Sequence, residues 1–503
     1  MEDREAGSGS AMMPEWTLVK IKELNAMKIR KNWLMRPVCM LLLLAVIVSL
    51  AGCQVVQTAQ PTLPDSDLTE LEQIMKKYDD AGYVYEYTGE PCTITMAHWN
   101  SSGANVERAV VEAVLQGFSA RYPEITVELE ILQDYESTYG QRLAAGTAHD
   151  VFLVPDGAIS GWAPSGKIMN LTPYIQNSAI LNDLDDIYDS CLTRYQYNAA
   201  TGLMGSGDQY ALPKDVGPYV MYYNKDWFEA MGVELPPADR IMTMEEAIEM
   251  WQALTKYDDA GNITGYGVAG ICVEGAVWSA GGDFLNETRD GFPTDEATLA
   301  GLAKGYQFIK DSYLTLMIQP PNTFSGTMSA ANLFAQQKVA TIWGGRWEVS
   351  TFRQLSFDWD VAYVPAFTES PTTNMYSGSV GYGISAKTTH ADAAFKLVEY
   401  IASKEGQEIL TATGFQIPVY ESLAYDEALV AREKELGPYN YEIFVESAKM
   451  QGYGLWQYRR NQIWKVNGYD IPSEYLVSYD PATEITVEEF LARAKELVNA
   501  NIR

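Results

Sequence analysis

The stretch "LPKDVGPYVMYYNKDWFEAMG" (Leu212–Gly232) decides the fold, because it opens a second block of alternating strands and helices. Helices are predicted after it at 242–261, where Thr243 serves as the N-cap, and at 299–314. Apolar runs and amphipathic stretches then continue to alternate. They predict strands at 360–367 and 381–386, a long helix at 391–414 and a last amphipathic helix at 485–500.

The chain before this stretch alternates in the same way. Strands are predicted at 93–99, 125–132 and 150–156, with helices at 105–123 and 135–148. Such an order implies an α/β fold, with a parallel sheet covered by helices and ligands bound at the carboxyl ends of the strands. The side chains expected at that edge are Trp99, Asn100, Ser101 and Asp156, although a helix or turn cap would equally explain Asp156.

Composition narrows the class of protein. The 503 residues suffice for two or three domains, and 47% hydrophobic with 20% charged residues is ordinary for a globular chain. A net charge of −30 argues against nucleic-acid binding, which needs a basic surface, and against a polybasic membrane patch. The 12 Trp and 32 Tyr are many, and such rings grip ligands as often as they fill a core.

The N-terminal region has the pattern of a bacterial lipoprotein signal. Basic residues in "MKIRKNWLMR" (27–36) precede an apolar run at 38–50 that is too short for a transmembrane helix. The following "LAGC" resembles a lipobox, so residues 1–52 are predicted to be a signal peptide, with translation starting at Met27 and 1–26 untranslated. Cys53 is then lipidated, with palmitate among the acyl groups expected, and 53–67 forms a polar tether on the extracytoplasmic face of the cell membrane.

The remaining cysteines are Cys92, Cys191 and Cys272. Their number is odd, so at least one is unpaired, and we expect buried thiols. No Cys/His spacing suggests zinc, and the sequence predicts neither a metal site nor a cofactor.

Four blocks occur in an order that carries a family resemblance. They are "DVFLVPDGAISGWAPSGKIMNLTPYI" (150–175), "LPKDVGPYVMYYNKDWFEAMGVELPP" (212–237), "LFAQQKVATIWGGRW" (333–347) and "GSVGYGISAKTTHADAAFKLVEYIASKEGQEIL" (378–410) with "GFQIPV" (414–419). Over about 93–498 the chain resembles extracellular solute-binding proteins of family 1, the lipoprotein receptors of carbohydrate ABC importers that are related to maltose-binding protein. Two departures are the extra residues 78–91 and Gln337, where the family often has Gly.

The resemblance implies a two-lobed periplasmic-binding-protein type II fold with a hinge and a ligand cleft between the lobes. Lobe 1 would comprise 68–217 with 366–417, and lobe 2 would comprise 218–365 with 418–503. The implied function is capture of a carbohydrate and its delivery to the transmembrane subunits of an ABC permease, by a monomer that is not an enzyme.

A sugar site needs aromatic rings for the flat C–H faces and planar polar groups for the hydroxyl rim. The resemblance makes Trp347 the stacking platform, with a core Trp as the alternative, and Gly344 would let the backbone turn tightly before it. Arg346 could fork onto hydroxyls or a carboxylate, or be a plain surface residue. The other candidates are Trp278 and Gly281 in "VWSAGG", Tyr376 and Ser379 on the return strand, Asp215 before the hinge strand, and Trp456.

Two alternatives stay open. The three His residues, His98, His149 and His390, form no catalytic motif, but carboxylates are plentiful enough for a secreted carbohydrate-active hydrolase. A protein of the same fold that binds a non-sugar ligand, such as a polyamine, would need an acidic cleft.

Overall fold

The computed structural model describes residues 69–99, 106–155, 157–320, 329–368, 375–412, 414–450 and 485–501. The chain divides into two compact units, 1–67 and 68–503, and the described residues lie in the second. No helix among them is both long enough and apolar enough to cross a bilayer. The predicted signal peptide, Cys53 and the tether lie outside the described residues.

The first sheet has the strand order β2-β1-β3-β14-β7. Its parallel part is β2 (Ile125–Leu132), β1 (Cys92–Trp99) and β3 (Val151–Val154), and antiparallel β14 (Gly381–Ile384) and β7 (Ala211–Pro213) complete it. The register of β1 with β2 runs from Cys92 opposite Ile125 to Trp99 opposite Leu132. Trp99 therefore stands at a strand's carboxyl end, as the sequence predicts.

Helices pack on this sheet through a large apolar core. They are α4 (Val106–Arg121), α5 (Tyr135–Ala145), α15 (Ala391–Ala402) and α16 (Lys404–Thr411). The single helix predicted at 391–414 is wrong, because Ser403 takes an extended conformation and caps a new helix, its side chain accepting a hydrogen bond from the Gly406 N–H. A Ser or Thr at such a position competes for backbone donors and favours a break.

The second sheet contains β12 (Trp359–Ala362), β8 (Gly217–Asn224), β11 (Val339–Gly345), β10 (Ile263–Ala269) and β9 (Lys256–Tyr257), in that order, and β13 (Ser377–Gly378) also pairs with β8. Strand β8 is the one that the opening stretch predicts. It lies between β11 and β12, both antiparallel to it. Its burial is nearly continuous because its side chains enter apolar cores on both faces of the sheet, Met221 and Tyr223 in one and Val220 and Tyr222 in the other. Strands β10 and β11 are parallel.

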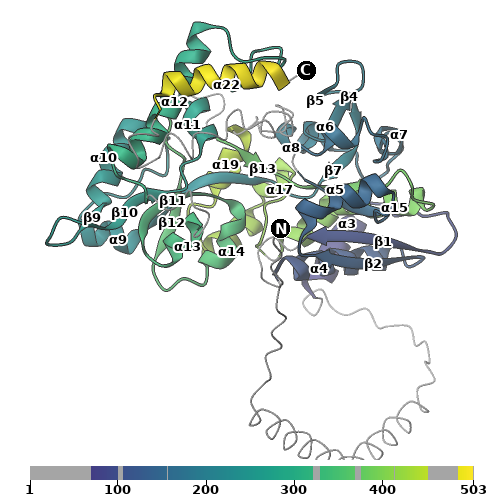
Figure 1. Cartoon of the computed structure of the whole chain (residues 1–503). Coiled ribbons are helices and arrows are strands. Elements are labelled where there is room, and N and C mark those ends of the chain that lie inside the picture. The colour runs from purple at the N-terminus through teal and green to yellow at the C-terminus, as the bar shows by residue number, and fades with distance from the viewer. Residues whose placement is uncertain are drawn as a thin grey trace, which may run out of the picture. The chain divides into compact units, whose positions relative to one another are not determined.

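Capping residues fix the starts of helices on the second sheet, and the cap at Thr243 is the predicted one. Asn224 caps α9 (Lys225–Met231), and Thr243 forms a capping box with Glu246 at α10 (Met244–Leu254). The predicted helix 242–261 ends early, because Thr255 is extended and the chain turns into β9. The predicted strand 360–367 is also shorter. Helices α11 (Val273–Ser279), α12 (Glu296–Leu314) and α22 (Val487–Asn501) complete this side, and Figure 1 shows α22 lying along α12.

The remaining elements complete the two lobes, and among them α19 (Glu442–Met450) packs against β8. They are α6 (Ile159–Trp162), α7 (Thr172–Ile175), η2 (Leu184–Asp186), α8 (Asp189–Thr193), the three-stranded sheet β5 (Leu203–Met204), β4 (Gln196–Asn198) and β6 (Asp208–Gln209), α13 (Ala330–Ala335), η4 (Arg346–Glu348), α14 (Val349–Phe352), α17 (Glu421–Ala424), α18 (Glu427–Leu436) and α19 (Glu442–Met450).

Within the described residues, the chain passes between the two sheets at 214–216, 379–380 and 414–416. Strand β7 ends in the first sheet and β8 begins in the second, while β13 pairs with β8 and β14 with β3. Further on, Phe415 belongs to the core of the first sheet and Ile417 to that of the second. This confirms two α/β lobes joined by crossing segments; the lobe boundaries given above stay a prediction.

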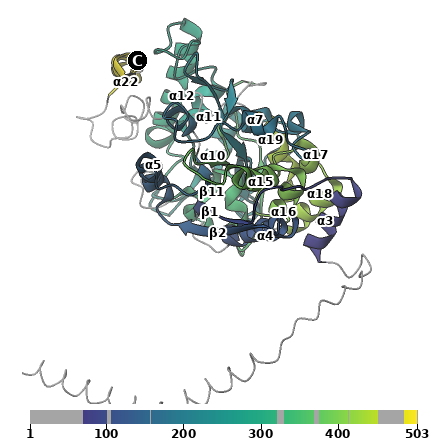
Figure 2. The same ribbon diagram turned by 90° about the vertical axis from the view of Figure 1, so that its right-hand side faces the viewer.

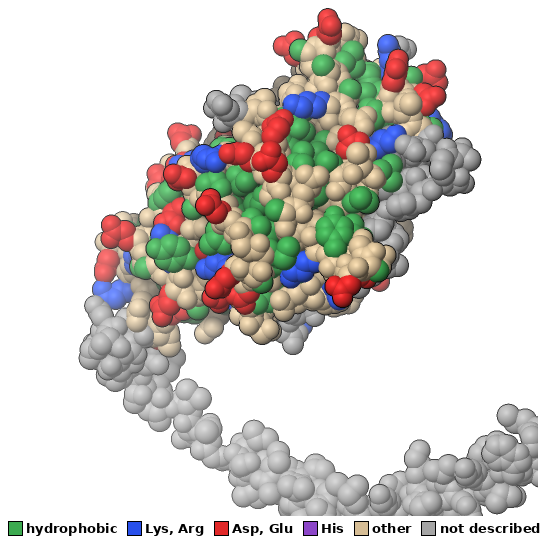
Figure 3. Space-filling model, turned by 90° about the vertical axis from the view of Figure 1, so that its left-hand side faces the viewer, with side chains coloured by type: hydrophobic (Ala, Val, Ile, Leu, Met, Phe, Trp, Pro, Cys, Tyr) green, Lys and Arg blue, Asp and Glu red, His purple; other side chains and the backbone are tan. Residues whose placement is uncertain are grey.

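Helix α3 (Glu70–Asp80) precedes β1, and the extra residues 78–91 comprise its last turn and a following segment that is not part of any helix or strand. Tyr85 and Tyr400 both donate to the buried Glu405, which also accepts from Arg121. Figure 2 shows α3 beside α16, and Figure 3 shows acidic side chains spread over one face rather than gathered in one patch.

Cys92, Cys191 and Cys272 are free thiols, and of these only Cys191 is fully buried.

Candidate functional site

A cavity of about 700 Å3 lies where the crossing segments meet the two sheets. The first lobe contributes Trp99, Glu107 and Pro155, and the second contributes α13, η4 and α14. Residues of the crossing segments line the space between them. The lining includes Trp99, Glu107, Asp215, Gly217, Arg346, Trp347, Glu348, Phe352, Tyr376, Gly378, Ser379 and Gln416.

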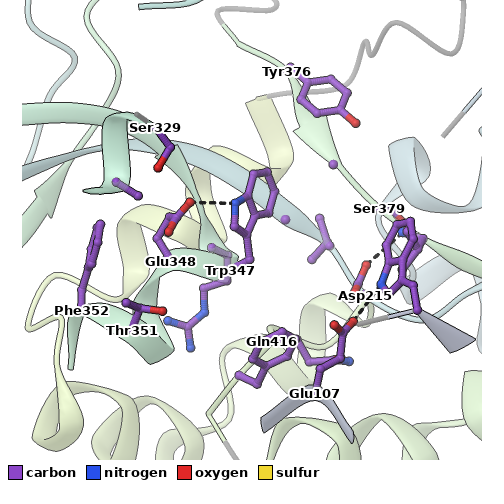
Figure 4. Close-up of a pocket in the computed structure, with 18 of the residues that line it drawn as sticks. Glu107, Asp215, Ser329, Trp347, Glu348, Thr351, Phe352, Tyr376, Ser379 and Gln416 are labelled. Atoms are coloured by element: carbon purple, nitrogen blue, oxygen red, sulfur yellow. Dashed lines mark hydrogen bonds between the residues drawn. The ribbon is translucent and has the colours of Figure 1, made fainter. Parts of the chain in front are cut away.

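Trp347 is the large aromatic side chain that the cavity leaves most open, with 38% of its surface exposed. Its indole lies against glycine backbone: a Cβ added at Gly345 would stand 2.2 Å from the ring, one at Gly217 3.1 Å and one at Gly378 3.3 Å. Tyr219 meets the ring edge-on at 5.3 Å, and Nε1 donates to Glu348 at 3.1 Å. Figure 4 shows the indole nitrogen turned toward Glu348, with Asp215 and Glu107 on the other side of the ring. These contacts fix the position of the Trp347 ring and leave part of its surface open to the cavity.

Trp99 faces the cavity from the first lobe and is held by a buried carboxylate. Its Nε1 donates to Glu107 at 2.9 Å, and its ring meets Tyr135 edge-on at 6.0 Å. Glu107 is 2% exposed and stands in the first turn of α4, where the helix dipole favours a negative charge. This pair gives the first lobe a rigid aromatic wall.

The crossing segments place charged and polar groups at the base of the cavity. Asp215 accepts from the Val380 N–H at 3.0 Å and from the fully buried Lys214 ammonium at 2.9 Å. Ser379 shares a hydrogen bond of 3.1 Å with Tyr195. Burial, assisted by the Lys214 charge, lowers the pKa of His98 to about 3, so this imidazole stays neutral beside Trp99. Asp215 and Ser379 therefore have two roles: they hydrogen-bond the crossing segments to each other and to the first lobe, and they line the cavity.

Arg346 is buried, not exposed. Its Nη2 donates to Glu433 at 2.6 Å and to the Gly414 carbonyl at 3.0 Å. Nearby, burial raises the pKa of Glu348 above the usual carboxyl range, and the hydrogen bond from Trp347 opposes that rise.

The structure brings six predicted site residues to one cavity: Trp99, Asp215, Arg346, Trp347, Tyr376 and Ser379. It does not bring three others there. Trp278 packs in the core of the second lobe beside Phe284, and Gly281 and Gly344 are outside the lining. Asn100, Ser101, Asp156 and Trp456 lie outside the described residues.

The expected tight turn at Gly344 is wrong. Gly344 and Gly345 continue strand β11 opposite Val220 and Tyr219, and a 3-10 helix begins at Arg346. Gly345 is needed for a different reason, because the Trp347 ring occupies the space of its missing side chain. Four further residues line the cavity without having been predicted there: Glu107, Glu348, Phe352 and Gln416. Only Gln416 carried a signal, since it falls in the block "GFQIPV".

The comparison with protein families gives a clear match. The model described as "Bacterial extracellular solute-binding protein" matches residues 100–408, more than half of the chain. Among curated proteins, the galactooligosaccharide-binding protein of Bacillus subtilis is 23% identical over 299 residues, 58% of this chain and 64% of that protein. The erythritol/L-threitol-binding protein of Mycolicibacterium smegmatis is 32% identical over 118 residues, 22% of this chain and 25% of that protein. The chain thus spans less than two thirds of each.

Solved structures share the fold. An ABC substrate-binding protein of Listeria monocytogenes in complex with cycloalternan has a TM-score of 0.63 at 19% identity, over 81% of this chain and 98% of that one. A maltose/maltodextrin-binding domain of Bdellovibrio bacteriovorus bound to maltotriose has a TM-score of 0.60 at 18% identity, over 81% of this chain and 99% of that one. The two lobes, their crossing segments and a family match over more than half of the chain show that it belongs to the bacterial extracellular solute-binding proteins.

Proposed function

We propose that this protein captures a carbohydrate between its lobes and delivers it to the permease subunits of an ABC importer. The observation that carries the proposal is Trp347, a ring that stays partly open in a cavity while its position is fixed by glycine backbone and Tyr219. An indole fixed in this way suits the flat C–H face of a sugar ring. The relatives named for sugars and sugar alcohols support the same ligand class.

Polar groups around the two Trp rings fit the hydroxyl rim of a sugar. Asp215, Glu348 and Gln416 line the cavity with carboxylate and amide groups that accept and donate hydrogen bonds. A buried hydroxyl left without a partner costs about 1–3 kcal/mol, so such groups select among sugars. A ligand that contacts Trp99 and Trp347 together would shift the population toward a closed arrangement of the lobes.

Calorimetric titration against a panel of neutral mono- and oligosaccharides, with peptides, amino acids and polyamines beside them, tests this proposal. We expect binding of at least one saccharide and a large loss of affinity in Trp347→Ala. A response to a peptide, an amino acid or a polyamine, with none to any sugar, would overturn it.

We further propose that the protein is not an enzyme and acts as a membrane-anchored receptor. Incubation with chromogenic glycosides should release no chromophore, and turnover that depends on one carboxylate would contradict this.

For the anchor, we expect the exported protein to partition into detergent and to carry a diacylglyceryl group on Cys53. Cys53→Ala should move it to the aqueous phase, and an unmodified Cys53 in the exported wild type would refute the anchor.

A further inference from the structure

Two buried side chains at one end of the cavity have hydrogen-bonding atoms to spare. Arg346 is 1% exposed and Gln416 is 4% exposed, and both line the cavity. Among the described residues, Arg346 Nε and Nη1 and Gln416 Oε1 have no hydrogen-bond partner. Because Arg346 donates to the Gly414 carbonyl, two residues before Gln416, both belong to the same end of the cavity.

Neither side chain is free to turn away. Glu433 accepts from Arg346 at 2.6 Å and from Arg353 at 2.8 Å, and the two guanidinium groups also share the Gly414 carbonyl. Gln416 donates Nε2 to the Lys214 carbonyl at 2.9 Å, which fixes the orientation of its amide and leaves Oε1 as the spare acceptor. Donors and an acceptor are therefore held in place before any ligand arrives.

We propose that Arg346 and Gln416 form a subsite for the hydroxyl groups of a neutral saccharide. This inference rests on the proposed carbohydrate function and narrows it. A hydroxyl accepts a hydrogen bond from Arg346 and donates one to Gln416 Oε1, so it satisfies both residues. A carboxylate has no proton for Gln416 Oε1 and meets the carboxylates of Glu107, Asp215 and Glu348 in the same lining. An ammonium group leaves the Arg346 donors unpaired and is repelled by their charge.

The chain supplies a matched control for each residue. Arg353 shares Glu433 and the Gly414 carbonyl with Arg346 but does not line the cavity. Gln407 donates to the same Lys214 carbonyl as Gln416, at 3.0 Å, and also lies outside the lining. A change that acts only by loosening the protein should appear in both members of a pair.

The test is calorimetric titration of the full-length mature protein with maltotriose, β-1,4-galactotriose, α-1,4-trigalacturonate and a glucosamine trimer. We expect a neutral trisaccharide to bind more tightly than either charged one. Arg346→Lys and Gln416→Leu should each weaken that binding by about tenfold or more, since each removes a hydrogen bond to a buried group. Arg353→Lys and Gln407→Leu should stay within about twofold, and thermal unfolding of all four variants reports any loss of folding.

The outcomes separate this inference from the proposed function. If wild type binds no saccharide, the proposed function fails and the subsite falls with it. If wild type prefers trigalacturonate or the glucosamine trimer, the carbohydrate function stands and the neutral subsite is overturned. Equal losses of affinity within each pair would likewise overturn it, since Arg346 and Gln416 would then act only as structural braces.

Discussion

The two cavity tryptophans are held by different means. Trp99 hydrogen-bonds to the buried Glu107, whereas Trp347 lies over glycine backbone and hydrogen-bonds to the partly exposed Glu348. The first lobe thus fixes its ring through a polar bond inside a core. The second lobe fixes its ring through shape, with glycine backbone and the Tyr219 ring against it and part of its surface left open. Affinity should therefore depend mainly on Trp347, and stability mainly on the Trp99 pair.

The largest effect that tests this comparison is expected from Trp347→Ala. We expect the affinity for the best saccharide to fall by about 100-fold, because the change removes a central aromatic anchor, while thermal unfolding changes little. Trp347→Phe, which keeps an aromatic face, is the control and should lose far less. An unchanged dissociation constant for Trp347→Ala would show that Trp347 does not stack on the ligand.

The next largest effect is expected from the Trp99 pair. Glu107→Ala leaves the partly buried indole N–H of Trp99 without its acceptor, which should lower the free energy of unfolding by about 1–3 kcal/mol. Glu107→Gln retains an acceptor oxygen and should lose less. Denaturant titration measures both, and equal losses would mean that the charge of Glu107, not its hydrogen bond, stabilises the lobe.

A smaller effect is expected where Trp347 meets backbone. In Gly217→Ala the new methyl would stand 3.1 Å from the ring, so the indole must shift by a few tenths of an ångström. We expect the saccharide dissociation constant to rise by about threefold, since a tilted platform stacks less well. Gly232→Ala, at a helix end away from the cavity, should leave affinity unchanged. If both variants bind like wild type, the close fit of the Trp347 ring against glycine backbone does not limit the affinity for the saccharide.

The smallest effect concerns Glu348. Burial raises its pKa in the folded protein, so the charged form costs stability. That cost is absent below the ordinary glutamate pKa, grows as the pH rises through the raised pKa and is complete above it. Glu348→Gln should therefore raise the unfolding temperature slightly at neutral pH and not at pH 4. A gain of equal size at both pH values would contradict this cause.

Much of the fold follows from sequence because its signals are local. The capping box at Thr243 and the apolar run of β8 set their elements directly. The break at Ser403 was missed because the hydrophobic pattern continues through it. Trp278 was misplaced for a related reason: a Trp beside two glycines has the same local pattern whether it faces a cavity or a core.

The site was harder to predict because it depends on contacts between distant segments. Nothing near Glu107 shows that it would bond to Trp99. Likewise, the hydrogen bonds of Arg346 to Gly414 and Glu433 join residues far apart in the chain, and they bury a side chain that was expected either to bind ligand or to lie on the surface.

The place of β14 in the first sheet has a consequence for biosynthesis. This strand lies between β3 and β7, although both of them are made long before it. Until residue 384 has left the ribosome, β7 lacks its partner and β3 keeps an open edge. The first lobe therefore cannot complete its sheet until residues 218–365, the first part of the second lobe, have been synthesised, so its folding depends on long-range contacts.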